Sequence, residues 1–374
     1  MIEAAVDTGV ITKAIQLACR APSLHNSQPW QWIVGETSVD LFADHRRVIR
    51  SADSSGREAL ISCGAALGHF RAAMAAVGWG TKVNRFPNPS DLDHLATVYF
   101  TPAHCVTMAE HDRADAILRR RTDRLPFRAP THWESFEPVL RRMIDHRKAT
   151  LDVLPDEARP QLAEASRLTE SLRRYDEYYH DELHWWTEPF RLYQGVPPSA
   201  LVSEEERNRV GINRAFPVAG DTDRRPEVAA DEAKVLVLST PENTRADSLN
   251  CGEVLSTVLL ECTMAGLATC PLTHITELPE SRERIQRLTG THDFPQVLLR
   301  VGRTPVVEET SEPTPRRPLS ASARVLSGVD RTSTFASSAT TSTRRSLCPA
   351  AGNARLIPTR LRSSSDTSAL AGTP

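Results

Sequence analysis

Two polar segments, far apart in the chain, carry the residue types best suited to binding a ligand. The first runs from Ala21 to Trp32 and reads APSLHNSQPWQW. Pro22 and Pro29 fix the backbone near its two ends, so its backbone amides and the side-chain amides of Asn26 and Gln28 could be presented in one geometry. Such a loop suits a planar ligand with polar edges. An ordinary connection between a helix and a strand is the alternative interpretation.

The second segment is the basic cluster Arg120–Arg124, which reads RRTDR. Guanidinium groups together with the Thr122 hydroxyl at a helix end are well matched to a terminal phosphate. A solvated basic helix face is the alternative. The sequence contains no G-x-G-x-x-G, G-x-x-x-x-G-K-[ST] or G-x-S-x-G motif, so none of these nucleotide or hydrolase fingerprints accounts for the cluster.

Composition narrows the class of protein. The chain has 374 residues, 40% of them hydrophobic and 25% charged, which suffices for two domains or two packed halves. Its net charge of -2 argues against nucleic acid or an anionic membrane as the main partner. The seven cysteines occur singly, which favours free thiols over a disulfide framework or a zinc site. With no signal-type N-terminus, we expect a soluble cytoplasmic protein without metal.

Hydrophobic periodicity predicts the elements that must position these segments. We expect helices over 9–20, from Ser55 to about Gly78, and around 117–124, and the second of these has capping-box spacing between Ser55 and Glu58. We expect strands over 30–34, 39–42, 95–100 and 296–302. Residues 268–272 are predicted to form a second proline turn. The sequence His180-Asp181-Glu182-Leu183-His184 only approaches the H-E-x-x-H zinc motif, and we interpret it as a partly solvated helix face.

The chain contains an internal similarity. Ser62-Cys63-Gly64 through Gly78 aligns without gaps on Asn250-Cys251-Gly252 through Gly266. This predicts two copies of one α+β unit fused head to tail, a dimer within one chain, and therefore a monomer. Chance similarity between two core helices is the alternative.

Two further regions stand out by composition. Residues 162–214 are helical in pattern and rich in Tyr and Trp, and we expect this insertion to fold over the site as a lid. From about Ser320 the composition changes to Ser, Thr, Arg and Ala, which predicts a disordered tail over 321–374, unless a change of reading frame produced it.

Taken together, the motifs resemble those of the FMN-dependent nitroreductase superfamily. Arg120-Arg121-Thr122-x-Arg124 resembles its R-R-S-x-R phosphate motif, and Ala21 to Trp30 resembles its A-P-S-x-x-N-x-Q-P-W flavin loop. Gly266 to Pro271 resembles its G-L-G-T-C segment, and Arg316-Arg317-Pro318-Leu319 resembles its closing basic motif. The fused arrangement, with Asp44-His45-Arg46-Arg47 and the aromatic insertion, is most similar to the dormancy-associated Acg-type NAD(P)H nitroreductases. The resemblance covers roughly residues 5 to 320.

The resemblance implies a duplicated α+β nitroreductase fold with mostly antiparallel sheets, a first half over 1–110 and a second half over 111–320. One FMN would lie between the halves, with NAD(P)H as reductant. The implied cofactor-binding residues are Pro22, Ser23, His25, Asn26 and Gln28 in the loop, Arg120, Arg121, Thr122, Arg124, Arg316 and Arg317 at the phosphate, and Thr269, Cys270, Pro271 and Leu272 beside the ring. His25 could contact the flavin or only pack, and nothing marks Cys270 as an activated thiol.

Two functions of different classes are compatible with this resemblance. The first is an NAD(P)H-dependent oxidoreductase that reduces nitroaromatic or quinone-like acceptors through flavin N5 in a stress response, with no side-chain acid or base required for the hydride step. The second is a protein that stores FMN beneath a closed lid with little turnover. A shared fold does not decide between them.

Overall fold

The computed structural model describes residues 5–188, 193–216, 223–305 and 313–326. Residues 1–327 form one compact unit, and it is this unit that is described below. Most of the tail expected over 321–374 lies outside the described residues.

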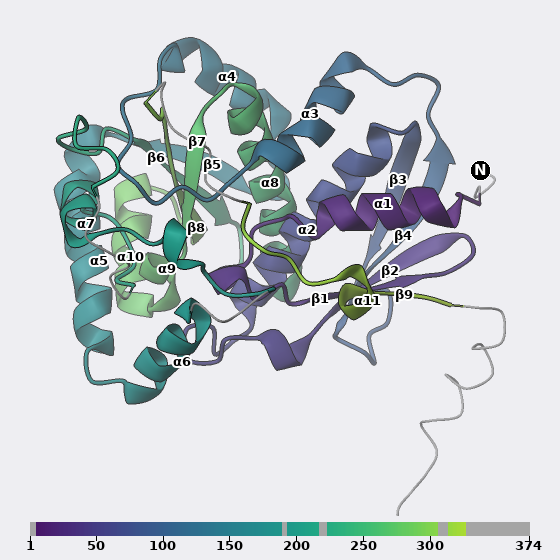
Figure 1. Ribbon diagram of the computed structural model, residues 1–374, viewed down its shortest axis with the longest axis horizontal. Coiled ribbons are helices and arrows are strands. Elements are labelled where there is room, and N and C mark those ends of the chain that lie inside the picture. Colours follow the sequence, from purple (N-terminus) through teal and green to yellow (C-terminus); the bar gives the residue numbers. More distant parts are fainter. Residues whose placement is uncertain (1–4, 189–192, 217–222, 306–312, 327–374) are drawn as a thin grey trace, which may run out of the picture. The chain divides into compact units, whose positions relative to one another are not determined.

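Two long helices form the centre of this unit (Figure 1). They are α2 (Arg57–Ala75) and α8 (Arg245–Met264), and they cross in close contact. A Cβ atom on Gly64 would lie 2.1 Å from the carbonyl oxygen of Leu249, and one on Gly252 would lie 2.1 Å from that of Ile61. Only glycine at both positions therefore lets the backbones meet. These two glycines occupy matching positions in the internal similarity, as expected if the helices are related copies.

The first sheet has the strand order β3-β4-β2-β1-β9, and all its strands except β9 come from the N-terminal part of the chain. Its strands are β1 (Trp30–Val34), β2 (Ser38–Ala43), β3 (Trp79–Arg85), β4 (His94–Pro102) and β9 (Ala323–Val325). All pairs are antiparallel except β1 and β9, which run parallel with Trp32 opposite Ala323. The predicted start of the tail at residue 321 was therefore too early, because β9 pairs its backbone with β1 and completes this sheet.

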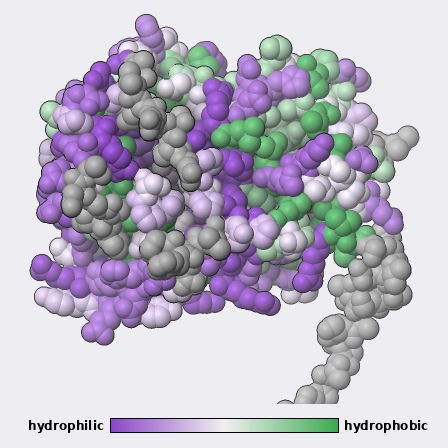
Figure 2. All heavy atoms as spheres, viewed as in Figure 1, coloured by the Kyte–Doolittle hydropathy of each residue, from purple (hydrophilic) through white to green (hydrophobic). Residues whose placement is uncertain are grey.

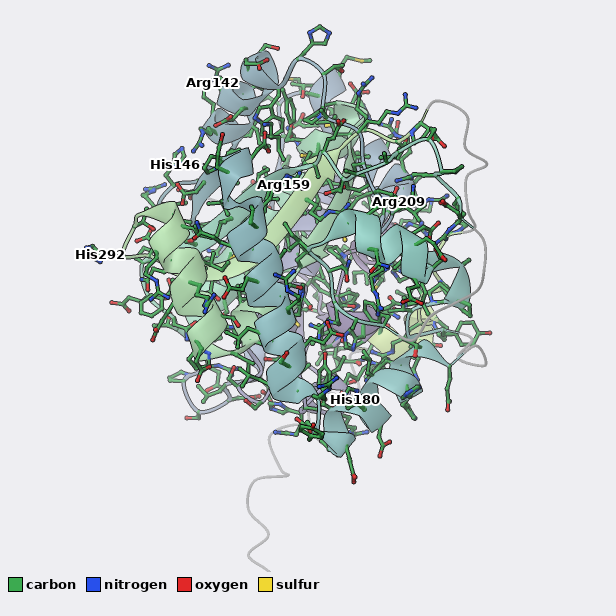
Figure 3. The ribbon with its side chains drawn as sticks, turned by 90° about the vertical axis from the view of Figure 1, so that its left-hand side faces the viewer. Arg142, His146, Arg159, His180, Arg209 and His292 are labelled. Carbon is green, nitrogen blue, oxygen red and sulfur yellow. The ribbon has the colours of Figure 1, made fainter. Side chains whose placement is uncertain are left out.

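The second sheet has the order β5-β6-β8-β7 and is antiparallel throughout. Its strands are β5 (Thr150–Leu154), β6 (Lys234–Thr240), β7 (Ala268–Leu272) and β8 (Phe294–Gly302). Successive residues of β6 face opposite sides. Leu236 and Leu238 pack toward α8, whereas Val235 and Val237 pack toward α5 (Arg159–Arg173) and α10 (Pro279–Thr289). Figure 3 shows α5 in front of this sheet, with Arg159 at its N-terminal end.

The remaining helices surround these layers. They are α1 (Thr8–Ala18), α3 (Met108–Arg119), α4 (Trp133–Met143), α6 (Glu177–Thr187), α7 (Glu204–Val210), α9 (His274–Glu277) and α11 (Leu319–Ser322), with short 3-10 turns at Leu24–Asn26, His45–Arg47, Asp156–Ala158 and Pro198–Ala200. The α+β class with mostly antiparallel sheets is confirmed. Within the described residues, no helix is long and apolar enough to cross a membrane. On the face of the molecule drawn in Figure 2, hydrophilic residues predominate on the left, where α5, α6 and α7 lie in Figure 1.

Three local predictions were wrong for identifiable reasons. The N-cap of α2 is Gly56 at φ 72, and its first turn is capped by Asp53, whose Oδ2 accepts from the Ala59 amide at 2.8 Å, so no Ser55–Glu58 capping box forms. The helix expected around 117–124 ends at Arg119, which leaves the basic cluster in extended backbone. Residues 268–272 form β7 instead of a turn, and Pro271 is tolerated because β7 is an edge strand.

Replacing Gly64 by Ala should force α2 and α8 apart, because the added methyl meets backbone atoms that cannot rotate away. We expect the free energy of unfolding to fall by about 3 kcal/mol, the upper end for an overpacked core, as measured by urea denaturation. Gly211→Ala is the matched control: its Cβ meets nothing within 4 Å, so it should lose only about 1 kcal/mol for its left-handed φ. Equal losses in the two variants would contradict this account.

Candidate functional site

Five arginines line one cavity, which we call the arginine-lined cavity. Arg124 also lines a second cavity, and we call the other four the arginine cluster: Arg20, Arg120, Arg121 and Arg316. Arg20 follows α1, Arg120 and Arg121 follow α3, and Arg316 lies just before α11. The carbonyl oxygen of Arg20, at the C-terminal end of α1, accepts from Arg120 Nη2 and from Arg316 Nη2, each at 3.1 Å. Three separate parts of the chain are thereby brought to one point.

The described residues place no carboxylate against the positive charge of the cluster. Within the part of the chain that the structure describes, none of the four is paired with a carboxylate. Arg20 Nε, Arg120 Nε and Nη1, and Arg121 Nη1 are buried without a hydrogen-bond acceptor. Burial and the neighbouring Arg20 lower the pKa of Arg120 to about 10, and burial with Arg120 and Arg20 lowers that of Arg316 to about 9. Unsatisfied donors and mutual repulsion of this kind fit a bound polyanionic group such as a phosphate.

A second, more apolar cavity adjoins the first, and we call it the central cavity. It encloses about 860 Å³ including its open mouth, and four residues, Pro22, Ser23, Thr122 and Arg124, line both cavities. Its apolar walls come from both central helices, the second sheet and the insertion, through Ile61, Leu255, Val297, Pro271, Leu272, Val202 and Phe216. Apolar walls with a few converging polar groups are typical of a small-molecule site.

The loop after Pro22 shapes the mouth of the central cavity through a constrained backbone. His25, Asn26 and Gln28 have φ angles of 46°, 58° and 52°, a region that side chains other than glycine rarely adopt. The Ser23 hydroxyl accepts from the Gln28 amide at 2.9 Å and holds this turn. Backbone held in this way often marks a functional site. The prediction of a rigid loop therefore agrees with its geometry.

His25 is one of the loop residues that line the central cavity. Its ring lies edge-on to Phe216 at 5.6 Å, and both ring nitrogens are buried without a partner. Burial, then the charges of Arg214 and Arg124, lower its pKa well below the ordinary value. A neutral imidazole with two free nitrogens can both donate to and accept from a ligand.

Two predicted site residues serve the protein itself. Gln28 lines neither cavity: its Nε2 donates to the Tyr193 carbonyl at 2.8 Å, and its Oε1 accepts from the Arg317 amide at 2.9 Å. Arg317 also lies outside both cavities, where its Nη1 donates to the Gln28 carbonyl at 3.1 Å and lies 3.9 Å from Asp44. Both residues join the loop to neighbouring segments, so their contribution to a site is one of position.

Other predicted residues are distributed between the cavities. Asn26 lines the arginine-lined cavity, but its Nδ2 donates to the carbonyls of Gly195 at 3.0 Å and Pro315 at 3.1 Å. Thr269 lines neither cavity and instead bridges to Thr122, holding the basic segment against β7. Cys270, Pro271 and Leu272 line the central cavity. Burial raises the pKa of Cys270, so the thiol is not activated.

Sequence reasoning missed several residues that the structure brings to these cavities. They are Arg20 in the arginine cluster and Glu58, Ser62, Arg214, Phe216 and His274 in the central cavity. Arg20 could have been found, because it directly precedes the Ala21–Trp32 loop. Glu58 carried a signal that we assigned to helix capping. The other four lie in segments whose approach depends on the tertiary fold.

Replacing Arg20 by Gln tests the anion site, since the Arg20 side chain makes no described hydrogen bond. Without an added anion, the variant should be at least as stable as the wild type, because a repelling charge is removed. Its sulfate affinity should fall about tenfold, the loss of one charge-assisted hydrogen bond, when melting temperature is followed against sulfate concentration. Exposed Arg46→Gln is the control and should match the wild type. Unchanged sulfate stabilisation in Arg20→Gln would argue against an anion site here.

No family model matches the chain. It is 56% identical over 319 residues to "Putative NAD(P)H nitroreductase acg" of Mycobacterium tuberculosis, covering 85% of this chain and 96% of that protein. It is 36% identical over 327 residues to a second protein of that organism with the same description, Rv3131, covering 84% and 91%.

Solved structures of low sequence identity were also found. The FMN-dependent nitroreductase NfnB of Mycobacterium smegmatis, in complex with NADPH, is 17% identical, with a TM-score of 0.37 over 58% of this chain and 98% of that one. A nitroreductase structure from Anabaena variabilis has a TM-score of 0.35 over 79% and 73%. The sequence relatives establish the family, because their sequence identity with this chain extends over most of both chains. The chain belongs to the Acg-type group of the nitroreductase superfamily.

Proposed function

We propose that this protein binds one FMN per chain and acts as an NAD(P)H-dependent oxidoreductase. The observation that carries the proposal is the arginine cluster, with unsatisfied buried donors, next to a cavity with mostly apolar walls. This pairing matches a molecule with a phosphate at one end and a flat ring system at the other. The relatives bear NAD(P)H nitroreductase descriptions, and the M. smegmatis structure is described as FMN-dependent.

In this proposal the chain's own residues divide the work. The arginine cluster and Thr122 would hold the phosphate, and Pro271 and Leu272 of β7 would form the wall for the ring. His25 would offer a neutral donor and acceptor at the cavity mouth. When bound, the flavin would supply the redox chemistry by accepting a hydride and passing it to an acceptor such as a nitroaromatic or a quinone. The protein contributes binding, orientation and exclusion of water.

In this proposal, each of the predicted halves, 1–110 and 111–320, supplies residues to one side of the site. The loop, Ile61 and Ser62 come from the first, whereas the basic segment, β7 and the insertion come from the second. A single chain would then complete the site without a partner subunit. We therefore propose a monomer.

A second candidate, FMN storage under a closed lid, is favoured by how firmly the insertion is attached. The side-chain amides of Asn26 and Gln28 donate hydrogen bonds to the insertion, to the carbonyls of Gly195 and Tyr193 respectively. Arg47 Nη2 donates to Gln194 Oε1 at 2.5 Å. The Ser51 amide donates to Glu182 Oε2 at 2.9 Å. If these contacts persist with flavin bound, they would keep nicotinamide from the ring.

One spectroscopic experiment distinguishes the two. Purified protein, reconstituted with FMN if necessary, should show a flavin absorbance band at about one equivalent, from one cavity pair per chain. Prompt anaerobic bleaching by NADPH or NADH would support the reductase. A band that resists both nucleotides but bleaches with dithionite would support storage. Failure to retain any FMN after reconstitution would contradict both functions.

A further inference from the structure

A buried carboxyl group faces the central cavity and has no role in the scheme above. Glu58 is the second residue of α2, and its side chain is 2% exposed. Its Oε1 accepts from Arg57 Nη2 at 3.1 Å, whereas its Oε2 is buried with no hydrogen-bond partner. An ionised carboxylate oxygen left unpaired in such a place would be strongly unfavourable. A proton on Oε2 removes that difficulty and gives Glu58, a residue that lines the cavity, an O–H donor.

The neighbouring charges act in both directions: Glu277 and Asp53 favour the neutral form of Glu58, whereas Arg57 and Arg214 favour the ionised form. Arg57 divides its guanidinium among Gln296, Thr276 and Glu58, so only part of its charge serves Glu58. Arg214, from the insertion, is paired with Glu277 of α9. Asp53 adds a further carboxyl near the start of α2, and Arg282 of α10 lies on the far side of Thr276, to whose carbonyl it donates. Burial, followed by the charge of Glu277, raises the pKa of Glu58 to about 8.

We propose that Glu58 is a catalytic acid that donates a proton to the acceptor bound in the central cavity. This inference rests on the proposed function, because it needs a hydride donor in the same cavity. A pocket that keeps a carboxylic acid neutral near pH 7 is a recognised way to equip a site for acid catalysis.

The step balances for a quinone acceptor. The reduced flavin, when bound, would supply the two electrons and one hydrogen of a hydride, and one further proton is required to form the hydroquinone. The O–H bond at Glu58 Oε2 breaks, and a new O–H bond forms at the quinone oxygen. The carboxylate that remains lies next to Arg57 and is reprotonated from water.

The test uses single-turnover oxidation of the reduced protein, which does not depend on nicotinamide access. The FMN-loaded protein is reduced with dithionite under anaerobic conditions and mixed with menadione, and flavin reoxidation is followed at pH values on both sides of 8. The wild-type rate should fall as pH rises through about 8, because the acid form of Glu58 is lost. Glu58→Gln keeps an oxygen for Arg57 but carries no titratable proton. It should react about 100-fold more slowly at neutral pH, at a rate independent of pH in this range.

A second readout does not require turnover or flavin. In the infrared spectrum of the FMN-free wild type, the carbonyl band of a protonated carboxyl should titrate with a midpoint near 8. The band should be absent in Glu58→Gln and retained in Glu157→Gln, a control that removes an exposed carboxylate. If Glu58→Gln does not fold, the wild-type band and pH profile still test the inference.

The outcomes separate this inference from the proposed function. A wild type that binds FMN but shows neither the titrating band nor the fall in rate would overturn the role of Glu58 and leave flavin binding intact. A Glu58→Gln variant with the wild-type pH profile would do the same. A wild type that binds no FMN would overturn the proposed function and, with it, this inference.

Discussion

The close crossing of α2 and α8 is the constraint on which the rest of this structure depends. Backbone meets backbone at Gly64 and Gly252, so the two helices approach more closely than any side chain would permit. Both sheets pack against this pair, and both helices send side chains into the central cavity: Glu58, Ile61 and Ser62 from α2, and Leu255 from α8. The position of the cavity walls is therefore set by the crossing.

The chain then closes the site by returning to its beginning. The segment before α11 carries Arg316 to the end of α1, and β9 adds a parallel strand to β1 (Figure 1). The same return places a third stretch of sequence beside Arg20 and Arg120, where the last carbonyls of α1 orient the guanidinium groups. The C-terminal end of a helix attracts cations, yet these carbonyls satisfy only part of the donors, and the arginines that carry the remainder line a cavity. The same group of side chains thus joins the separate segments and lines the cavity.

The two ends of the site are electrostatically distinct. The arginine-lined cavity concentrates positive charge, and the described part of the chain supplies the four arginines of the cluster with no carboxylate partner, which is unfavourable until an anion binds. In the central cavity burial instead favours the neutral form of three groups: it lowers the pKa of His25 and raises those of Glu58 and Cys270. Arg214 and Arg300 also line this cavity, and each is paired with a carboxylate. An end rich in unpaired guanidinium groups and a more apolar end would let one molecule with a charged group and a ring span both.

The sequence by itself determined the local chemistry, the fold class and the family. The α+β architecture, strands β1, β4 and β8, and the family followed from periodicity and from four motifs in order, because these depend on residues close together in the chain. Only the tertiary structure decided which motif residues face a cavity. Arg316 belongs to the arginine cluster, whereas the side chain of its neighbour Arg317 lies near Asp44. The side chain of Gln28 makes hydrogen bonds to backbone groups of segments far away in the chain. Glu58 resembled a helix cap in sequence, and its buried, unpaired oxygen exists only because helices, insertion and sheet close around it. Contacts between distant segments fix burial and hydrogen-bond partners, and no local pattern encodes them.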